Sequence, residues 1–285
     1  MKDPANPPTI AVFDSGVGGL SILAEALRLL PGCRFDYLCD NAGFPYGTRA
    51  DKFIIQRSQR VIETYFQQCQ MMPDMLVVAC NTASTLALPH LRATFDLPII
   101  GVVPAIKPAA AYSRTGVIGL LATPATTKRA YTQKLINDYA ADCQVISQGS
   151  SNLVVMAENK LRGLPPDLSL LAEELKIFTQ VSALNPHPEK LDCLVLACTH
   201  FPLLEEEIQA CLGPQVQLLD SGKAIAKRIH YWCDQLGYSC HQETSRVLEG
   251  TAWFSAKDPE LETMKPCLNP LQLTRVSYLA NLDDL

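Results

Sequence analysis

The stretch Asp74-Met-Leu-Val-Val-Ala-Cys80-Asn-Thr82 organises the chain, because it recurs as Asp192-Cys-Leu-Val-Leu-Ala-Cys198-Thr-His200. In each copy an aspartate precedes an apolar run that ends in Ala-Cys and a polar pair. An unbroken apolar run of this kind is typical of a strand buried on both faces, as in a parallel sheet covered by helices. The repeat therefore predicts two related α/β halves. Each half carries one cysteine at the carboxyl end of a strand, where open α/β sheets bind ligands.

Other short apolar runs alternate with longer amphipathic stretches, which extends the α/β prediction to the whole chain. The segments expected to be strands are 9–13, 34–39, 74–80, 97–103, 115–121, 143–147, 192–198 and 216–220, with a further pair at 247–254 and 274–279. Helical periodicity is clearest over Leu20 to Leu30, Ala50 to Gln70 and Lys128 to Tyr139. The fold class expected is α/β, with mostly parallel sheets in two pseudo-symmetric domains.

The proline- and glycine-rich segment Gly101 to Pro108 predicts a hinge between the two halves. The expected domains are residues 1–103 with 218–285, carrying Asp14 and Cys80, and residues 104–217, carrying Cys198 and His200. The tail after Trp232 is expected to be mainly structural.

Composition excludes several functional classes. The net charge is −5 and the Lys and Arg residues are scattered, so no nucleic-acid partner is expected. No apolar run approaches the ~20 residues that span a bilayer, so no membrane insertion is expected. The start MKDPANPP has no apolar signal region, so no secretory signal is expected and the cytoplasm is the expected location. The odd count of 11 cysteines then favours reduced thiols.

Cys80 and Cys198 are the leading catalytic candidates. A cysteine between a strand end and a helix N-terminus lies among free N–H groups and the positive end of the helix dipole, which favours the thiolate. The other cysteines are expected to be buried packing residues: Cys33, Cys39, Cys69, Cys143, Cys193, Cys211, Cys233, Cys240 and Cys267. No C-x-x-C pair is present, so no metal site is expected.

Asp14 ends the first strand in the segment Phe13-Asp-Ser-Gly-Val-Gly-Gly19. The glycines allow the backbone to approach a ligand, and the exposed amides could form an anion nest. A dinucleotide loop is the alternative, with Asp36 as its acidic residue. The third glycine position of that motif is Ser21, and Asp14 would repel a pyrophosphate, so this alternative is weak but open.

Several polar residues accompany the two cysteines. His200 supplies a base beside Cys198, although a lone histidine is more often structural. Asn81, Thr82 and Thr199 supply hydrogen-bond donors near a substrate carboxylate. Taken alone, Pro45-Tyr46-Gly47 indicates only a turn, Glu158 indicates a solvated helix charge, and Asp40 is ambiguous.

Together these motifs resemble the glutamate racemases of bacterial cell-wall synthesis, within the aspartate/glutamate racemase superfamily. The matching blocks are Phe13 to Gly19, Asp40 with Pro45 to Gly47, Val77 to Ser84, Gly101 to Pro108, Gly119 to Thr123, Cys198 to Pro202 and Asp220 to Gly222. Each block is a weak signal by itself, but the ordered set is highly specific, and it spans residues 9 to about 230.

The resemblance implies a cofactor-independent isomerase that converts L-glutamate to D-glutamate, with its active site in the cleft between two α/β domains. Cys80, assisted by Asp14, would act on the D-enantiomer, and Cys198, assisted by His200, on the L-enantiomer. Residues implied to contact or line the substrate are Asp14, Ser15, Tyr46, Gly47, Asn81, Thr82, Thr199 and His200, with Asp40 and Glu158 as supporting acidic residues. A homodimer is a further expectation, and the Val102 to Pro108 stretch resembles members activated by a peptidoglycan precursor.

Three alternatives stay open on the residues alone. A cysteine hydrolase could use Cys198 as nucleophile and His200 as base, but the Cys80 copy would then have no role. A two-lobed ligand-binding module would use neither thiol. A racemase could also act on aspartate, because only the motif match favours glutamate. No lysine lies in a recognisable Schiff-base context, so no cofactor is expected.

Overall fold

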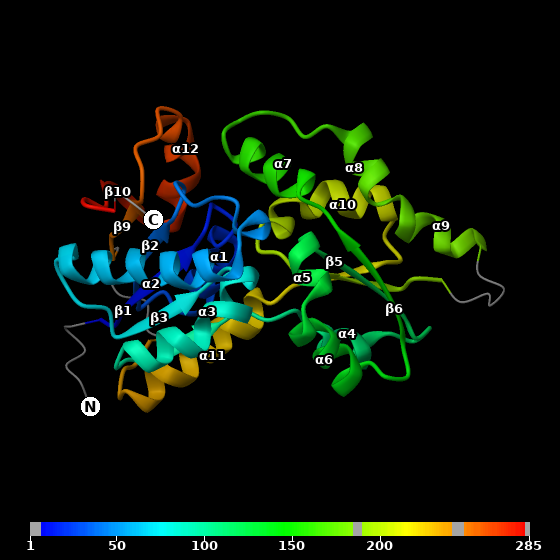
Figure 1. Ribbon diagram of the computed structural model, residues 1–285, viewed down its shortest axis with the longest axis horizontal. Coiled ribbons are helices and arrows are strands. Elements are labelled where there is room, and N and C mark those ends of the chain that lie inside the picture. Colours follow the sequence, from blue (N-terminus) through cyan, green and yellow to red (C-terminus); the bar gives the residue numbers. More distant parts are fainter. Residues whose placement is uncertain (1–6, 185–189, 241–247, 283–285) are drawn as a thin grey trace. The chain divides into compact units, whose positions relative to one another are not determined.

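The computed structural model describes residues 7–184, 190–240 and 248–282, which form two compact units (Figure 1). Unit 1 consists of residues 1–102 and 222–285, and unit 2 of residues 103–221. The divisions expected from the sequence were at 103/104 and 217/218, within four residues of these bounds, and the assignment of two domains stays a prediction. The start of the chain, residues 1–6, and Val247 of the expected tail strand lie outside the described residues.

Unit 1 contains a six-stranded sheet in the order β10-β9-β2-β1-β3-β4, and every pairing in it is parallel. The strands are β1 (Thr9–Asp14), β2 (Arg34–Cys39), β3 (Met75–Val78), β4 (Ile99–Gly101), β9 (Gly250–Phe254) and β10 (Leu273–Tyr278). The helices are α1 (Leu20–Leu29), α2 (Asp51–Gln68), α3 (Asn81–Thr94), α11 (Gly222–Gln235) and α12 (Leu261–Leu268), with 3-10 turns η1 (Tyr46–Thr48) and η3 (Asn269–Leu271).

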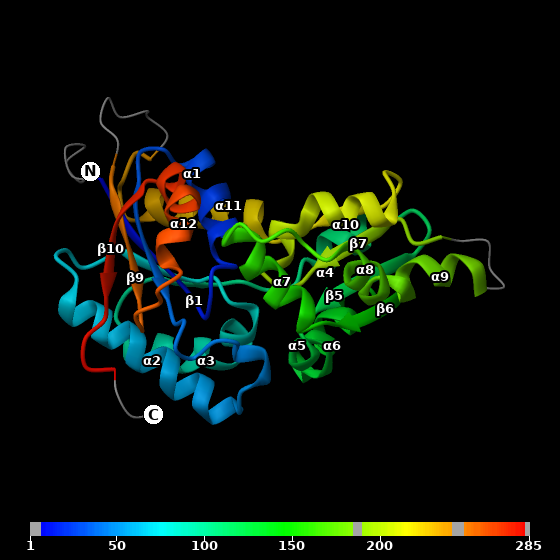
Figure 2. The ribbon, with the colours of Figure 1, turned by 90° about the horizontal axis from the view of Figure 1, so that it is seen from above.

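Helices cover both faces of this sheet, which explains its continuous apolar strands. Helices α1 and α11 pack together on one face, and α2 and α3 pack together on the other (Figure 2). β1 and β3 are buried along their whole lengths. The α2–α3 face of the core includes Phe13, Val61, Tyr65, Leu76 and Leu91, all fully buried.

Unit 2 contains a four-stranded parallel sheet in the order β6-β5-β7-β8. Its strands are β5 (Val117–Ala122), β6 (Gln144–Gly149), β7 (Cys193–Leu196) and β8 (Gln217–Leu219). Its helices are α4 (Ile106–Tyr112), α5 (Pro124–Lys128), α6 (Ala130–Tyr139), α7 (Asn152–Leu161), α8 (Leu168–Glu174), α9 (Lys176–Leu184) and α10 (Glu205–Leu212), with the 3-10 helix η2 (Phe201–Leu204).

The two units share one topology. In each, the first strand lies between the second and the third, and the fourth follows the third: β2-β1-β3-β4 in unit 1 and β6-β5-β7-β8 in unit 2. The alanine before each candidate cysteine bonds the first strand at the same position. The Ala79 N–H donates to Phe13 O over 2.7 Å, and the Ala197 N–H donates to Leu121 O over 2.8 Å. The two copies of the repeated sequence therefore occupy the same position in the two sheets.

The repeated aspartates anchor the chain near the start of the first strand of each sheet. Asp74 Oδ2 accepts the Thr9 N–H at 3.0 Å. Asp192 Oδ2 accepts the N–H groups of Arg114 and Thr115 at 2.7 and 3.2 Å, and its Oδ1 accepts the Ser113 hydroxyl at 2.7 Å. Although partial burial opposes it, these hydrogen bonds lower the pKa of Asp192 below its usual value of 3.8. Both aspartates therefore hold the backbone in place near the start of the first strand of their sheet.

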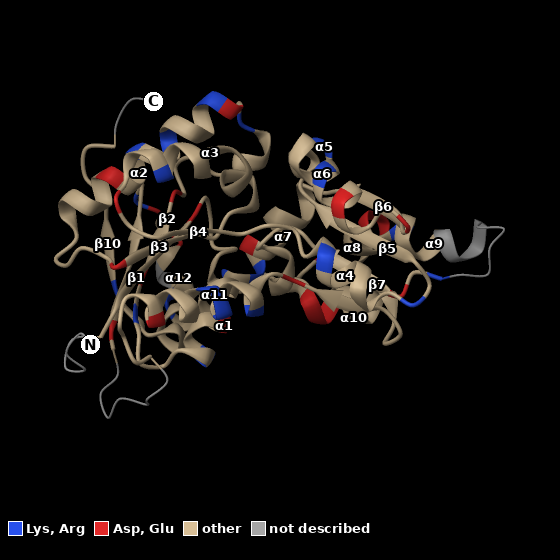
Figure 3. Cartoon of the chain, turned by 90° about the horizontal axis from the view of Figure 1, so that it is seen from below, with Lys and Arg blue, Asp and Glu red and all other residues tan. Residues whose placement is uncertain are grey.

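The expected α/β class and its parallel sheets are confirmed. The tail differs in one respect from the simple strand pair expected: β9 and β10 are parallel, and helix α12 lies between them in the chain. Parallel neighbours need a crossover connection, which α12 supplies. Lys, Arg, Asp and Glu are interspersed over both units (Figure 3). Among the described residues, no helix is long and apolar enough to cross a bilayer.

Candidate active site

Cys80 follows β3 and is the N-cap residue of α3. Its side chain is buried, with 6% exposed. The sulfur accepts the Ala83 N–H at 3.5 Å, so it occupies the place of a capping oxygen. At this end of a helix, the free N–H groups and the dipole stabilise negative charge on sulfur. The predicted strand–cysteine–helix arrangement is present in unit 1.

Asp14 and Ser15 connect a carboxylate to this thiol. Asp14 ends β1, the neighbour of β3, and is completely buried. Its Oδ1 accepts the Ser15 N–H at 2.6 Å and the Ser15 hydroxyl at 3.3 Å. Ser15 Oγ also lies 3.7 Å from Cys80 Sγ. A hydroxyl has one proton to donate and can rotate between these partners, so Ser15 can couple the carboxylate to the sulfur.

The glycines of the loop after Asp14 all lie outside the left-handed region, and the expected anion nest stays a prediction. Gly19 has a φ of −61°, and the positive-φ glycines of the described chain are at 116, 163, 213 and 237. The space around Gly19 explains its identity: an added Cβ would lie 3.0 Å from the Cβ atoms of Ala79 and Asp14. Glycine here allows α1 to start directly against the ends of β1 and β3.

Asp40 belongs to a buried network around Tyr46. The Asp40 N–H donates to Asp14 O at 2.9 Å, which continues the β1–β2 ladder. Tyr46, in η1, donates its hydroxyl to Asp40 Oδ2 at 2.7 Å. Burial first, and then the Asp40 charge, raises the pKa of Tyr46 well above 10, so this hydroxyl remains a donor. The tyrosine hydroxyl is thus bonded to Asp40, whereas Gly47 beside it is half-buried.

Arg57, which the sequence reasoning missed, completes this network. Its Nε lies 3.1 and 3.0 Å from the two Asp40 oxygens, and its Nη2 donates to Oδ1 at 2.8 Å. Its Nη1 donates to the Leu282 carbonyl at 3.2 Å. Burial opposes protonation, but the hydrogen bonds and charge of Asp40 outweigh it and raise the pKa of Arg57 above its ordinary value. The Arg57 guanidinium therefore neutralises the charge of the Asp40 carboxylate, which is buried at the end of β2.

Asn81 and Thr82 lie in the first turn of α3 and are both buried. Asn81 Oδ1 has no hydrogen-bond partner among the described residues, although solvent does not reach it. Such a buried amide needs an explanation. Because the two ends of an asparagine amide are interchangeable in assignment, this group can present either C=O or NH₂ to a bound molecule.

In unit 2, Cys198 is followed by a buried dyad of His200 and Glu158. Cys198 Sγ lies 3.8 Å from His200 Nδ1, and His200 Nε2 lies 2.8 Å from Glu158 Oε1. His200 is 3% exposed and Glu158, on α7, is 4% exposed. Glu158 Oε2 accepts Arg162 Nη1 at 3.2 Å. The default interpretation of Glu158 as a solvated helix charge is therefore wrong.

The dyad determines the charge of His200. Burial by itself lowers the pKa of His200, but the hydrogen bonds and charges of Cys198 and Glu158 outweigh it and raise this pKa well above 6.5. A doubly protonated imidazole has a donor on each nitrogen, one for each partner. The raised pKa favours the imidazolium form of His200, which is placed to stabilise a thiolate on Cys198. Thr199, between the two, is also buried.

The expectation that Cys198, like Cys80, begins an α-helix is wrong. The chain turns at Thr199 and His200 and enters η2 before α10 begins at Glu205. Pro202 is the reason, because it has no N–H to donate to Cys198 O in an i+4 helical bond. Phe201 donates to that carbonyl instead, at 3.0 Å. The imidazolium takes the electrostatic role that the α3 N-terminus has beside Cys80.

The dinucleotide alternative is contradicted by the position of Asp36. This residue lies within β2, where Oδ2 accepts the Tyr65 hydroxyl at 2.9 Å and Oδ1 accepts the Thr251 N–H at 2.9 Å. Asp36 therefore joins β2 to α2 and β9 and has no free oxygen for a ribose.

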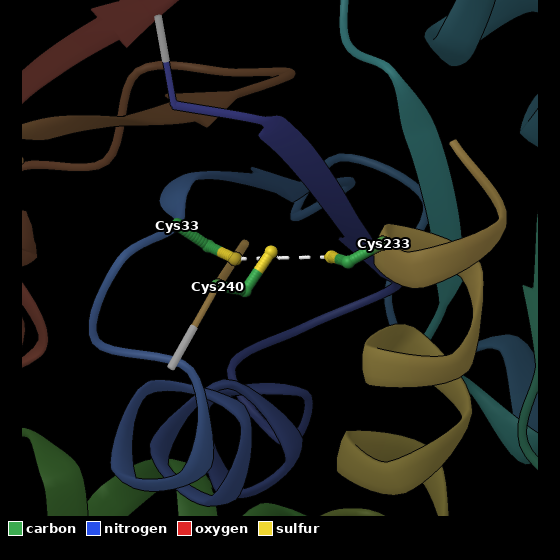
Figure 4. A group of neighbouring side chains, drawn as sticks. All are labelled: Cys33, Cys233 and Cys240. Atoms are coloured by element: carbon green, nitrogen blue, oxygen red, sulfur yellow. Dashed lines mark hydrogen bonds between the residues drawn. The ribbon is translucent and has the colours of Figure 1, made fainter. Parts of the chain in front are cut away.

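The other cysteines are not all isolated packing residues. Cys69, Cys143, Cys211 and Cys267 are only half-buried, whereas Cys39 and Cys193 are buried as expected. Cys33, Cys233 and Cys240 are buried together, with their sulfurs within 4.8 Å of one another (Figure 4). They constitute the group of possible metal ligands found among the described residues. The spacing of these cysteines along the chain does not indicate this cluster.

Comparison with known proteins gives a consistent assignment. The Asp/Glu/Hydantoin racemase model matches residues 21–229. A glutamate racemase of Sodalis glossinidius is 49% identical over 79% of this chain and 74% of its own length. One of Haemophilus influenzae is 46% identical over 92% of this chain and 93% of its own length. The crystal structure of Escherichia coli glutamate racemase with L-glutamate and the activator UDP-MurNAc-Ala superposes with a TM-score of 0.86 and 40% identity, covering 96% of this chain and 99% of that one. The resemblance inferred from the motifs is confirmed, and the chain belongs to the Asp/Glu/Hydantoin racemase family.

Proposed function

We propose that this chain is a glutamate racemase, an isomerase in which Cys80 and Cys198 are the two acid–base groups and no cofactor takes part. One observation carries the proposal: two buried thiols follow the third strand of the same sheet order in each unit. Each thiol has its own charged support, Asp14 through Ser15 in unit 1 and Glu158 through His200 in unit 2. The similarity to glutamate racemases supports glutamate as the substrate.

Racemisation requires one group on each face of the α-carbon. With L-glutamate, the Cys198 thiolate removes the α-proton, and the electron pair of the broken C–H bond spreads onto the substrate carboxylate. The Cys80 thiol then donates its proton to the opposite face, which forms D-glutamate and leaves a thiolate on Cys80. Conversion of D-glutamate runs through the same steps in reverse. The mechanism requires both thiols to reach the same carbon.

Proton transfer alone cannot supply the rate. Positioned acid–base groups contribute roughly 10²–10⁴-fold, whereas an amino-acid α-proton is very weakly acidic. The remaining stabilisation must act on the negative charge that develops on the carboxylate. Buried polar groups beside the thiols can stabilise this charge, namely Asn81 and Thr82 next to Cys80, and Thr199 next to Cys198. We assign them, with Ser15 and Gly47, to substrate binding.

The two supports give the thiols separate roles. Asp14 is proposed to accept and return the Cys80 proton through Ser15, so it assists turnover of D-glutamate. His200 is proposed to stabilise the Cys198 thiolate and so assists turnover of L-glutamate. Asp40 and Tyr46 would hold the loop that contains Gly47 rather than contact the reacting carbon. Glu158 acts through His200 as a positioning residue.

The biological setting follows from the same proposal. D-Glutamate is a building block of peptidoglycan, and a protein that supplies it belongs in the cytoplasm. Because the similar Escherichia coli enzyme was crystallised with UDP-MurNAc-Ala as activator, we propose that a peptidoglycan precursor of this kind activates this chain as well. A homodimer stays a prediction.

The decisive test is racemisation of purified protein in D₂O, followed by circular dichroism and α-proton NMR. We expect L-glutamate to racemise with no cofactor added, and early D-glutamate to carry deuterium while the remaining L-glutamate stays protiated. Deuterium that enters the starting enantiomer rapidly, or protium that transfers into the product, would indicate a single base. L-Aspartate is the matched substrate control, and faster turnover of aspartate would overturn the choice of glutamate. An acyl adduct on Cys198 in the intact mass would favour the hydrolase alternative.

A further inference from the structure

A cluster of three thiols lies in unit 1 among residues that the proposed racemisation does not use. Cys33 immediately precedes β2, Cys233 is in the last turn of α11, and Cys240 follows that helix by five residues. All three are buried. Cys33 Sγ and Cys233 Sγ are 3.9 Å apart, and all three sulfurs lie within 4.8 Å of one another. In Figure 4 the side chains point toward a common centre, with Cys240 between the other two.

Backbone hydrogen bonds fix the segments that carry these thiols. The Cys33 N–H donates to Leu30 O at 3.1 Å, and the Gly32 N–H donates to Cys240 O at 3.2 Å. The Tyr238 N–H donates to Cys233 O at 2.9 Å. The Cys33 bond forms the turn before β2, and the Gly32 bond joins this turn to Cys240. The Tyr238 bond closes the end of α11. Backbone hydrogen bonds therefore hold the segments that carry the three sulfurs in place, in addition to the contact between the Cys33 and Cys233 sulfurs.

The Tyr238 side chain adds a further anchor to this framework. Its hydroxyl donates to Asp74 Oδ1, whose second oxygen accepts the Thr9 N–H at 3.0 Å. Gly237, at a φ of +81°, makes the tight turn that follows α11, since left-handed backbone favours glycine. The chain between Cys233 and Cys240 is thus tied to the start of β1 as well as to the turn before β2.

The spacing of the sulfurs matches the requirement of a thiolate-bound cation. A zinc–sulfur bond of about 2.3 Å gives sulfur–sulfur distances of roughly 3.8 Å in a tetrahedron and roughly 4.0 Å in a trigonal plane. The 3.9 Å between Cys33 and Cys233 falls between these values. Soft thiolate ligands select d¹⁰ cations such as Zn²⁺ and Cu⁺. Structural metal sites contribute directly to folding, because the bound ion joins the segments that carry its ligands.

We propose that Cys33, Cys233 and Cys240 form a structural binding site for a thiophilic d¹⁰ cation, with Zn²⁺ as its reference ion. Binding replaces the three S–H protons by three metal–sulfur bonds and releases those protons to solvent, without any change of oxidation state. The bound ion joins the end of α11 to the turn between α1 and β2. Racemisation does not pass through this ion, so the site is independent of the proposed function.

The test uses the full chain and Co²⁺ as a spectroscopic probe. The reduced protein is titrated with Co²⁺ and then with Zn²⁺ while absorbance is recorded, and proton release is followed in weak buffer. We expect one equivalent of Co²⁺ to produce thiolate-to-cobalt charge-transfer bands and the d–d bands of a low-coordinate cobalt thiolate, and one equivalent of Zn²⁺ to abolish them. Because these measurements need no substitution, they test the site even where a variant fails to fold.

Single variants locate the site. Cys240→Ser is expected to lose the charge-transfer band or weaken Co²⁺ affinity at least tenfold. Cys69→Ser, which removes a half-buried thiol elsewhere in unit 1, is the matched control and should keep the band. Cys80→Ser should keep it as well. The proposal is overturned by a stoichiometric titration without thiolate bands, by a band that Cys240→Ser retains or Cys80→Ser loses, or by an unreduced intact mass that shows a disulfide among the three cysteines.

Discussion

Replacing Glu158 by glutamine isolates the electrostatic support of Cys198. The substitution keeps the shape of the side chain and an oxygen that can accept from His200 Nε2, but it removes the negative charge. The pKa of His200 then falls, because the carboxylate is one of the two groups that raise it. With less imidazolium beside Cys198, negative charge that develops on that sulfur is stabilised less, and L-glutamate turnover slows.

The contact geometry sets the size of the effect. The Nε2···Oε1 distance is 2.8 Å, and both side chains are at least 95% buried, so solvent screening is weak. A hydrogen bond to a charged group contributes about 1.5–3 kcal/mol. Since about 1.36 kcal/mol corresponds to a tenfold change in rate, kcat for L-glutamate should fall about 10- to 150-fold. The alkaline limb of the kcat profile should move to lower pH, because the His200 pKa falls.

The assay is circular dichroism in both directions, with kcat and KM determined separately for each enantiomer. In Glu158→Gln, kcat should fall more for L-glutamate than for D-glutamate, and Asp14→Asn should show the opposite bias. The ratio kcat/KM must fall equally in both directions, because the equilibrium constant between enantiomers is unity. Glu207→Gln is the matched control: it removes a carboxylate 2.7 Å from Lys160 in the same unit and should change kcat less than twofold. Equal kcat losses for both enantiomers, with no shift of the pH profile, would refute the assignment of Glu158 and His200 to Cys198.

Three further outcomes are expected. Cys80→Ser and Cys198→Ser should each abolish net racemisation in the same assay, because a hydroxyl is a much weaker acid and base than a thiol at neutral pH; substantial turnover in either variant would show that its cysteine only packs. Arg57→Met should lower the free energy of unfolding in urea by about 3–5 kcal/mol, because it leaves a carboxylate buried without its cation, whereas exposed Arg60→Met should change it little. Because the pKa of His200 is raised in the folded protein, its contribution to the free energy of unfolding is complete below pH 6.5 and is lost as pH rises through the higher folded-state pKa. Urea unfolding measured against pH should show this loss in the parent chain. A parent profile as flat as that of His200→Gln would contradict the prediction.

The strands were predictable because their signal is local. A strand buried on both faces is mostly apolar, and β3 and β7 lie within the apolar runs of the two repeats. The equivalent positions of Cys80 and Cys198 were predictable as well, because each cysteine follows a copy of the same repeated strand. The different turns after the two cysteines depend on one residue, Pro202, which has no N–H to donate to Cys198 O in a helical hydrogen bond.

The buried charges were harder to predict, because a charged residue on a helix is usually solvated. A signal existed nevertheless. Arg57 follows Ile54 by three residues and precedes Val61 by four, which places it on the buried stripe of α2. Glu158 follows Val154 by four residues and so shares the buried face of α7. A charge at an apolar-stripe position predicts a buried partner, but it cannot identify that partner.

The three-cysteine cluster could not be found from spacing, because its members are brought together by topology. Cys33 and Cys233 are 200 residues apart, and they meet because α1 and α11 pack on the same face of the unit 1 sheet. Sequence rules for metal sites rely on ligands a few residues apart, so a site assembled from a turn and a distant helix escapes them.

The order of strands in unit 1 has a consequence for how the chain is made. Every strand of the unit 2 sheet comes from one continuous stretch, residues 117–219, so that sheet can form as soon as its last strand has left the ribosome. β2, in contrast, pairs with β9, and 211 residues separate Cys39 from Gly250 (250 − 39). At about 5–20 residues per second, translation leaves one edge of β2 without its partner for roughly 10–40 s. An unpaired, apolar edge strand readily pairs with another chain. The edge of β2 that pairs with β9 therefore stays open through the synthesis of unit 2, and unit 1 is completed only after unit 2.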